Sequence, residues 1–182
     1  MYDAYKFMGC VFDEKTGNAV FRTWAPHADS VSVIGEFNDW DENKGKMEPD
    51  GSGLFSLAVG GVKTFDASKF VIHSGEKTIY KADPYAVHAE KNDNCNSKAY
   101  DLSRVKINDA KYFSKLKNKD IYNSPMSIYE AHIGSWRLHD DGNVYSYRDF
   151  ADAIVPYLKK MKFTHLELMG VAEHPFDGSW GY

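Results

Sequence analysis

The sequence predicts a β-sandwich, then a connecting arm, then the opening of an α/β domain. Three observations lead to this order. Short strand-like runs separated by glycine-containing turns fill the first part of the chain, a polar, asparagine-rich stretch covers residues 91–125, and residues 127–171 follow a strand–helix–strand pattern. Short strands with frequent turns are typical of antiparallel sandwiches, whereas a strand–helix–strand unit is typical of parallel pairing.

Runs rich in β-branched and aromatic residues are expected to form the strands of the sandwich. They span residues 20–24, 31–37, 54–59, 70–72 and 78–80. Turn residues such as Asp50-Gly51 and Gly60-Gly61 separate them. Trp24 closes the first run, and because it belongs to an alternating strand we expect it in the core.

The arm is expected to carry little regular structure, because it is polar and rich in asparagine. Within it, residues 110–116 are predicted to form a short helix, and Asn123-Ser124-Pro125 marks a boundary. We therefore divide the chain into a sandwich at 1–90, an arm at 91–125 and an α/β portion at 126–182.

The α/β portion is predicted to contain buried strands at 127–133 and 165–171. Ser146 is a suitable helix N-cap, with Asp149 three positions later, where a capping carboxylate belongs. Pro156 lies inside this helix and is expected to kink it. Apolar residues recur on one helical face, at Phe150, Ile154, Leu158 and Met161.

The length of this portion suggests a longer protein. Two parallel strands and one helix leave sheet surface uncovered, and a complete (β/α)8 barrel needs about 250 residues. Only 57 residues run from Met126 to Tyr182. We therefore expect the chain to be truncated. We also expect poor solubility, because the second strand would be an unpaired apolar edge.

Composition and charge indicate which kinds of partner the chain is expected to bind. The formal net charge is −4 and lysine is scattered along the chain, which argues against a nucleic-acid partner. No apolar run resembles a signal peptide or reaches the length of a membrane span, so no membrane partner and a cytoplasmic location are expected. Aromatic residues make up 15% of the chain, and their flat faces suit sugar rings.

No metal or cofactor is expected. Cys10 and Cys95 match no metal-binding or redox spacing. The histidines of the carboxyl-terminal part do not stand at the four-residue spacing that places two ligands on one helix face; they are His132, His139, His165 and His174.

Three segments carry a resemblance to known families. Residues 23–40, which read TWAPHADSVSVIGEFNDW, and residues 81–86, KADPYA, resemble the glycogen-binding sandwich of carbohydrate-binding module family 48. Residues 127–136, SIYEAHIGSW, resemble the first barrel strand of branching enzymes in glycoside hydrolase family 13. Residues 163–182 resemble the second strand of those enzymes and the loop after it.

The resemblance implies an immunoglobulin-like sandwich followed by the first β-α-β portion of a (β/α)8 TIM barrel. It also implies a retaining reaction that cuts α-1,4-glucan chains and joins them as α-1,6 branches. In that family the nucleophilic Asp, the acid/base Glu and a helper Asp follow barrel strands four, five and seven, whereas the resemblance here ends after strand two. No catalytic residue is therefore expected, and the polypeptide alone is expected neither to branch nor to hydrolyse glucan.

Aromatic residues are the substrate contacts that the resemblance implies. Tyr182 matches the tyrosine that stacks on the sugar beside the scissile bond, and Trp180 could line the same pocket. Trp40 and Tyr80 match two ring positions that grip α-1,4-glucan in the sandwich module. Each of these rings could instead serve packing, Tyr182 in a core, Trp180 under its loop and Trp40 at the sandwich edge.

Carboxylates outside these positions are expected to be structural. Glu130 and Glu167 lie inside strands, whereas catalytic residues of such barrels lie at the strand ends. Glu173 and Asp177 are expected to shape the last loop.

The sequence also departs from the family pattern. Lys162 replaces a glycine after the helix, and a lysine adopts the left-handed conformation there at a cost of about 1–2 kcal/mol. Gly170 replaces a proline, and Asp39 replaces a glycine or asparagine.

Two alternatives remain open. One is a stand-alone glucan-binding module that targets a partner to glycogen. The other is a different family 13 enzyme, such as a debranching enzyme. Residues 126–182 argue against the first, and the loop at 173–182 favours branching over the second.

Overall fold

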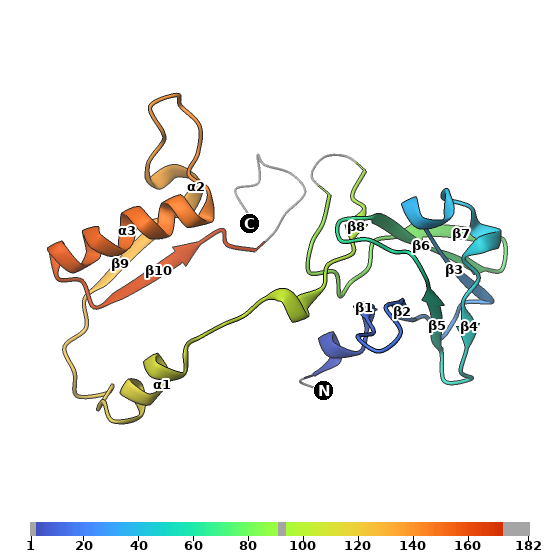
Figure 1. Cartoon of the computed structure of the whole chain (residues 1–182), viewed down its shortest axis with the longest axis horizontal. Helices are drawn as coiled ribbons and strands as arrows, with labels where there is room; N and C mark the ends of the chain where they lie inside the picture. The colour runs from blue at the N-terminus through green and yellow to red at the C-terminus, as the bar shows by residue number, and fades with distance from the viewer. Residues whose placement is uncertain (1–2, 91–93, 173–182) are drawn as a thin grey trace. The chain divides into compact units, whose positions relative to one another are not determined.

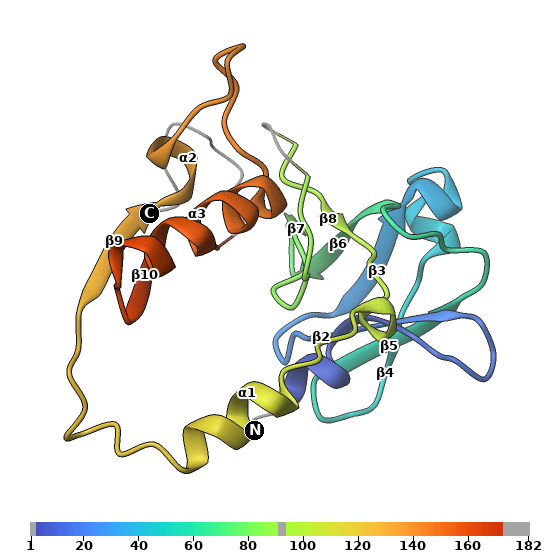
Figure 2. The ribbon, with the colours of Figure 1, turned by 60° about the vertical axis from the view of Figure 1, so that its left-hand side comes forward.

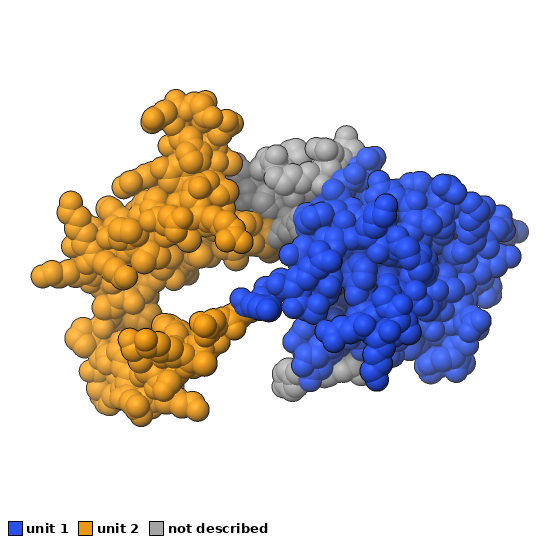
Figure 3. All heavy atoms as spheres, in the orientation of Figure 1, with its two compact units in different colours: residues 1–106 blue, residues 107–182 orange. Residues whose placement is uncertain are grey.

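The computed structural model describes residues 3–90 and 94–172. The chain divides into two compact units, Met1–Lys106 and Ile107–Tyr182, shown in blue and orange in Figure 3. The predicted arm at 91–125 spans this division.

Unit 1 consists of two antiparallel sheets (Figure 1). The first has the order β1-β2-β5-β4 and comprises β1 (Gly9–Phe12), β2 (Ala19–Trp24), β5 (Leu54–Val59) and β4 (Glu48–Pro49). The second has the order β3-β6-β7, with β8 also paired to β6, and comprises β3 (Ser30–Gly35), β6 (Ala67–Ser74), β7 (Lys77–Lys81) and β8 (Ser97–Lys98). Unit 1 also contains four single-turn helices: η1 (Ala4–Lys6) before β1, η2 (Glu36–Asn38) and η3 (Glu42–Lys44) between β3 and β4, and η4 (Leu102–Arg104) after β8.

The core of unit 1 lies between these two sheets. Phe21 of β2 and Phe55 of β5 belong to the same buried cluster as Val31 of β3 and Phe70 of β6. Phe37, just after β3, packs against this cluster, with its ring centroid 5.2 Å from that of Phe21. Apolar residues from both inner sheet faces therefore form one core, which confirms the predicted β-sandwich.

The predicted core position of Trp24 is wrong. Its side chain is 65% exposed. Along β2, Ala19, Phe21 and Thr23 are buried, so the residues between them point outward. Trp24 shares the outward phase with Arg22, because successive side chains of a strand alternate between its faces.

Unit 2 contains a parallel strand pair covered by a helix. Its elements are α1 (Ala110–Lys117), β9 (Ile128–His132), α2 (Ile133–Trp136), α3 (Tyr147–Met161) and β10 (His165–Met169). Strands β9 and β10 are parallel, with Glu130 and Glu167 as register partners. Figures 1 and 2 show α3 lying along one face of this pair. The predicted strand–helix–strand unit and the short helix in the arm are confirmed.

The ends of α3 follow the expected chemistry. Ser146 and Asp149 form the predicted capping box, with the Asp149 amide donating to Ser146 Oγ over 3.2 Å. Lys162 closes the helix in the left-handed conformation, with φ 64° and ψ 26°. Pro156 lies inside the helix, as predicted.

The core of unit 2 is smaller than that of unit 1. Phe150 and Ile154 of α3 pack on Ala131 of β9, and Leu158 lies against this cluster. Met161, the last apolar residue of the predicted helical face, is 52% exposed at the helix end. Among the described residues, no helix has the length and apolar character needed to span a membrane.

Candidate functional site

One candidate site is the outer face of the β3-β6-β7 sheet. Phe70 and Ile72 of β6 point toward the core, so Lys69, Val71 and His73 point to the opposite face. Tyr80 of β7 is the register partner of Val71 and therefore lies on this outer face. Its side chain is 59% exposed.

The loop that carries Trp40 is anchored to this sheet. Asn38 is buried; its Nδ2 donates to the Val33 carbonyl over 3.0 Å, and its Oδ1 accepts from the Gly35 amide over 2.9 Å. At the end of the loop, the Val33 amide donates to the Gly45 carbonyl over 2.8 Å. A Cβ at Gly45 would overlap the Val33 carbonyl oxygen, so this close approach requires glycine.

The loop also reaches over the outer face. Glu42 of η3 contacts the Nε2 of His73, and His73 lies on that face. Figures 1 and 2 both show the cyan single-turn helices of this loop beside β3. The loop that bears Trp40 and the strand that bears Tyr80 therefore belong to the same side of the sheet.

Trp40 is held in an unfavourable backbone conformation. Asp39 has φ 58° and Trp40 has φ 59°, both in the left-handed region. A bulky residue there is a conformational outlier, at a cost of about 1–2 kcal/mol per residue. The Trp40 amide donates to the Gly35 carbonyl over 3.0 Å, and the residue is 40% exposed.

A salt bridge supports the same turn. Lys44 Nζ lies 2.8 Å from Asp39 Oδ2. The Lys44 ammonium, as hydrogen-bond donor and as charge, holds the pKa of Asp39 below its ordinary value. The Asp39 side chain is thus held by Lys44, whereas the neighbouring Trp40 remains partly exposed.

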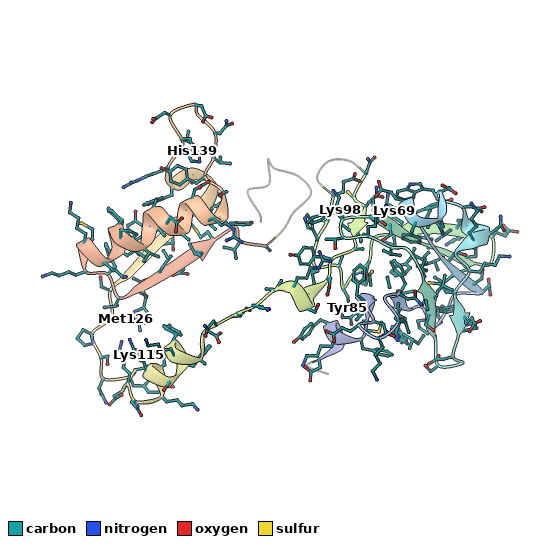
Figure 4. The ribbon with its side chains drawn as sticks, in the orientation of Figure 1. Lys69, Tyr85, Lys98, Lys115, Met126 and His139 are labelled. Carbon is teal, nitrogen blue, oxygen red and sulfur yellow. The ribbon has the colours of Figure 1, made fainter. Side chains whose placement is uncertain are left out.

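Sequence reasoning missed Lys69. It lies on β6 two residues before Val71, on the outer face, and it is labelled in Figure 4. Lys69 is partly exposed, and its ammonium group is a hydrogen-bond donor. The alternation along β6 could have revealed it, because a lysine between Ser68 and Phe70 must face away from the core.

A pocket lies on another part of unit 1. It has a volume of about 210 Å³ and is lined by β1, β8, η4 and the segment after β7. Burial raises the pKa of the Asp83 carboxyl. The carboxyl also accepts hydrogen bonds from the backbone amides of Cys10 and Tyr85, over 3.0 and 2.8 Å, which lower this pKa but by less than burial raises it. Burial likewise raises the pKa of the Cys10 thiol to about 12. These groups stabilise the junction of β1 with the end of the sandwich.

The structure brings together only part of the predicted site. The loop that bears Trp40 contacts the sheet face that bears Tyr80, whereas Tyr182 and Trp180 lie outside the described residues, as do Glu173 and Asp177. In unit 2, Glu130 and Glu167 are adjacent across the strand pair and both are exposed.

Comparison with known proteins assigns the sandwich to a family. Residues 7–86 match the model of carbohydrate-binding module 48 (isoamylase N-terminal domain). The fold is also that of larger enzymes. The Group B Streptococcus pullulanase SAP superposes with a TM-score of 0.69 at 20% identity, over 93% of this chain and 24% of that one. The catalytic module of the pneumococcal factor SpuA gives a TM-score of 0.67 at 21% identity, over 96% and 28%.

The class of protein that this chain is similar to is therefore the one that carries a carbohydrate-binding module of family 48, matched here by residues 7–86. Over its whole length the chain is similar to 1,4-alpha-glucan branching enzymes GlgB, at 47% identity for that of Butyrivibrio fibrisolvens and 40% for that of Bacillus cereus. Both alignments include 100% of this chain but only 29% of the relative. The resemblance found in the three sequence segments is confirmed over the full length of the chain.

Proposed function

We propose that the outer face of the β3-β6-β7 sheet binds α-1,4-glucan, with Trp40 and Tyr80 as stacking surfaces and Lys69 as a hydrogen-bond donor. One observation carries this proposal. Tyr80 is exposed on the outer face of this sheet, and Trp40 is exposed in a strained loop that contacts the same face and is anchored by the buried Asn38. Strain of this kind persists where the surrounding structure enforces it, and it clusters at ligand sites.

The chemistry of the site suits a glucan chain. A glucosyl ring has an apolar face that packs on an aromatic ring, and its hydroxyl groups accept hydrogen bonds from an ammonium group. Two rings on one sheet can contact successive parts of the same chain. The pullulanase SAP, which shares this fold, has been solved in complex with maltotetraose, which supports an α-glucan as the ligand class.

Titration of the 182-residue chain with maltoheptaose, followed by calorimetry, tests the proposal. Trp40→Ala and Tyr80→Ala are each expected to weaken binding about tenfold or more, because aromatic residues dominate such contacts. Trp24→Ala is the matched control, since Trp24 is also exposed but lies on the other sheet. Equal loss in all three variants, or unchanged affinity in Trp40→Ala, would contradict the assignment.

We further propose that residues 126–182 begin the (β/α)8 barrel of a branching enzyme, which cuts α-1,4-glucan and forms α-1,6 branches. The sandwich would then occupy 1–90 and the arm 91–125. The identity to GlgB enzymes extends through unit 2, and the parallel β9–β10 pair with α3 on one face fits a barrel opening. A stand-alone targeting module would need unit 1 alone.

In this assignment Tyr182 forms one aromatic wall of the reaction pocket, with Trp180 near it, and the catalytic carboxylates belong to later strands. The test is the branching rate of the whole enzyme with amylose, followed by iodine colour. Tyr182→Ala is expected to lower the rate at least tenfold, whereas Tyr182→Phe, which keeps the ring, should retain most of it. Equal rates for Tyr182→Ala and the unmodified enzyme would remove Tyr182 from the site.

A further inference from the structure

A chain of three side chains crosses the outer face of the β3-β6-β7 sheet. The Oε1 of Glu42, on η3, contacts the Nε2 of His73, on β6. On the other side of the same ring, the Oγ1 of Thr78, on β7, lies 3.0 Å from the Nδ1 of His73. One imidazole ring therefore joins η3 to the two strands of the β6–β7 hairpin.

The hydrogen-bond roles in this chain are mutually consistent. A carboxylate only accepts, so the Nε2–H of His73 donates to Glu42. In the neutral ring with this tautomer, Nδ1 is an acceptor, and the Thr78 hydroxyl donates to it. Each of the three groups has the partner that it needs, which fixes the orientation of the ring relative to both neighbours.

The two ends of the chain lie next to the two proposed stacking residues. Glu42 follows Trp40 by two positions in the same loop, and Thr78 precedes Tyr80 by two positions on the same face of β7. His73 and Thr78 are register partners, as are Val71 and Tyr80. The contacts thus connect the segment that presents the indole with the strand that presents the phenol.

We propose that Glu42, His73 and Thr78 form a positioning clamp that fixes the spacing between Trp40 and Tyr80 and thereby sets the affinity for glucans long enough to span both rings. This inference rests on the proposed glucan-binding function. The side chains of His73 and Glu42 are 33% and 36% exposed, so they lie at the surface and not in the sandwich core. A partly exposed pair adds little to stability, so its contribution lies in restricting the loop.

The clamp makes a prediction that a general stabilising role does not. A maltoheptaose chain that contacts both rings benefits from a fixed spacing, whereas maltose contacts one ring. Glu42→Ala should therefore weaken maltoheptaose binding about three- to tenfold, because the loop that bears Trp40 must then be ordered when the sugar binds. Maltose binding, measured by NMR titration of the full chain, should change less than about twofold by the same reasoning.

Conservative and control variants sharpen the test. Glu42→Gln keeps an oxygen that accepts from Nε2–H and should restore most of the maltoheptaose affinity. Thr78→Val removes the hydroxyl with little change of shape, and its effect should not add to that of Glu42→Ala, because both break one chain. Glu76→Ala, an exposed glutamate in the β6–β7 turn, is the matched control and should bind as the unmodified chain does.

The outcomes separate the clamp from the function on which it rests. If the unmodified chain binds maltoheptaose and Glu42→Ala binds it equally well, the clamp is wrong and the glucan site stands. If Glu42→Ala lowers maltose and maltoheptaose affinity by the same factor, the chain is a general structural contact and the clamp is again wrong. If the unmodified chain binds neither sugar, the glucan site and the clamp both fall.

Discussion

The two units differ in how their sheets are covered. In unit 1, residues from both sheets meet in one core, and the outer face of the β3-β6-β7 sheet is partly covered as well, since Val71 is fully buried there. In unit 2, α3 covers one face of the β9–β10 pair. The opposite face of this pair carries Ile128, Glu130, His165 and Glu167, all of which are exposed.

The difference shows what holds each unit together. Unit 1 depends on apolar burial between sheets. Unit 2 depends on an aromatic cluster, in which Trp136 Nε1 donates to the Tyr129 hydroxyl over 3.0 Å and the Trp136 ring lies 5.4 Å from that of Phe150. Arg137 stacks on the same indole at 4.3 Å. Such contacts are specific, but they bury less apolar area than two facing sheets do.

The largest expected effect concerns the cores. Phe70→Ala should lower the free energy of unfolding of unit 1 by about 3–5 kcal/mol, because it leaves a cavity between the sheets. Phe150→Ala removes the same group from unit 2. Hydrogen exchange should show faster amide exchange in β6 for the first variant and in β9 and β10 for the second. Equal changes in both units for either variant would contradict separate cores. Phe113→Ala, at an exposed position, is the control.

A smaller effect is expected at the start of α3. Ser146→Ala should cost about 1 kcal/mol, because the capping box is lost. The hydrogen bond from Ser146 holds the pKa of Asp149 below its ordinary value. This contribution is therefore present above the unfolded pKa, near about 4, and is lost as the pH falls through the folded pKa. Urea unfolding monitored by helical circular dichroism at neutral and acidic pH measures the cost of Ser146→Ala.

Ser114→Ala, inside α1, is the control and should have little effect. A cost that does not shrink in acid would contradict a contribution from the hydrogen bond between Ser146 Oγ and the Asp149 carboxylate.

The smallest expected effect is an increase in the stability of α3. Lys162→Gly should stabilise α3 by somewhat less than about 1 kcal/mol, because glycine adopts the left-handed conformation without strain. Lys160→Gly, inside the last turn, should instead destabilise the helix by about 1 kcal/mol. Thermal melting of both variants makes the comparison. Destabilisation by both substitutions would show that Lys162 makes contacts worth more than its strain.

Much of the fold was predictable because its signals are local. The run at 54–59 coincides with β5, and the parallel strand–helix–strand unit with its capping box was expected from Ser146, Asp149 and the apolar helix face. Alternation and caps involve neighbours along the chain, so they are visible without a structure.

The misses depend on distant partners. β4 and β8 are two residues each, and they are strands only because β5 and β6 pair with them. Trp24 was wrongly predicted to lie in the core, because an aromatic residue at the end of a strand does not show by itself which face of the strand is inward. Of the candidate site, sequence suggested Trp40 and Tyr80. The contact of Glu42 with His73 appears only when segments far apart in the chain are placed side by side, and the contacts of Asn38 with Val33 and Gly35 require the particular fold of their loop.

The exposed face of the β9–β10 pair imposes a chemical condition on anything that packs against it. Glu130 and Glu167 stand opposite each other in the parallel register, so two carboxylates share one patch of surface. Like charges so placed repel, and removing both from water without compensation is costly. Packing an aliphatic surface against this patch would be unfavourable. A surface with guanidinium, ammonium or amide N–H groups could pair with the two carboxylates and would pack favourably.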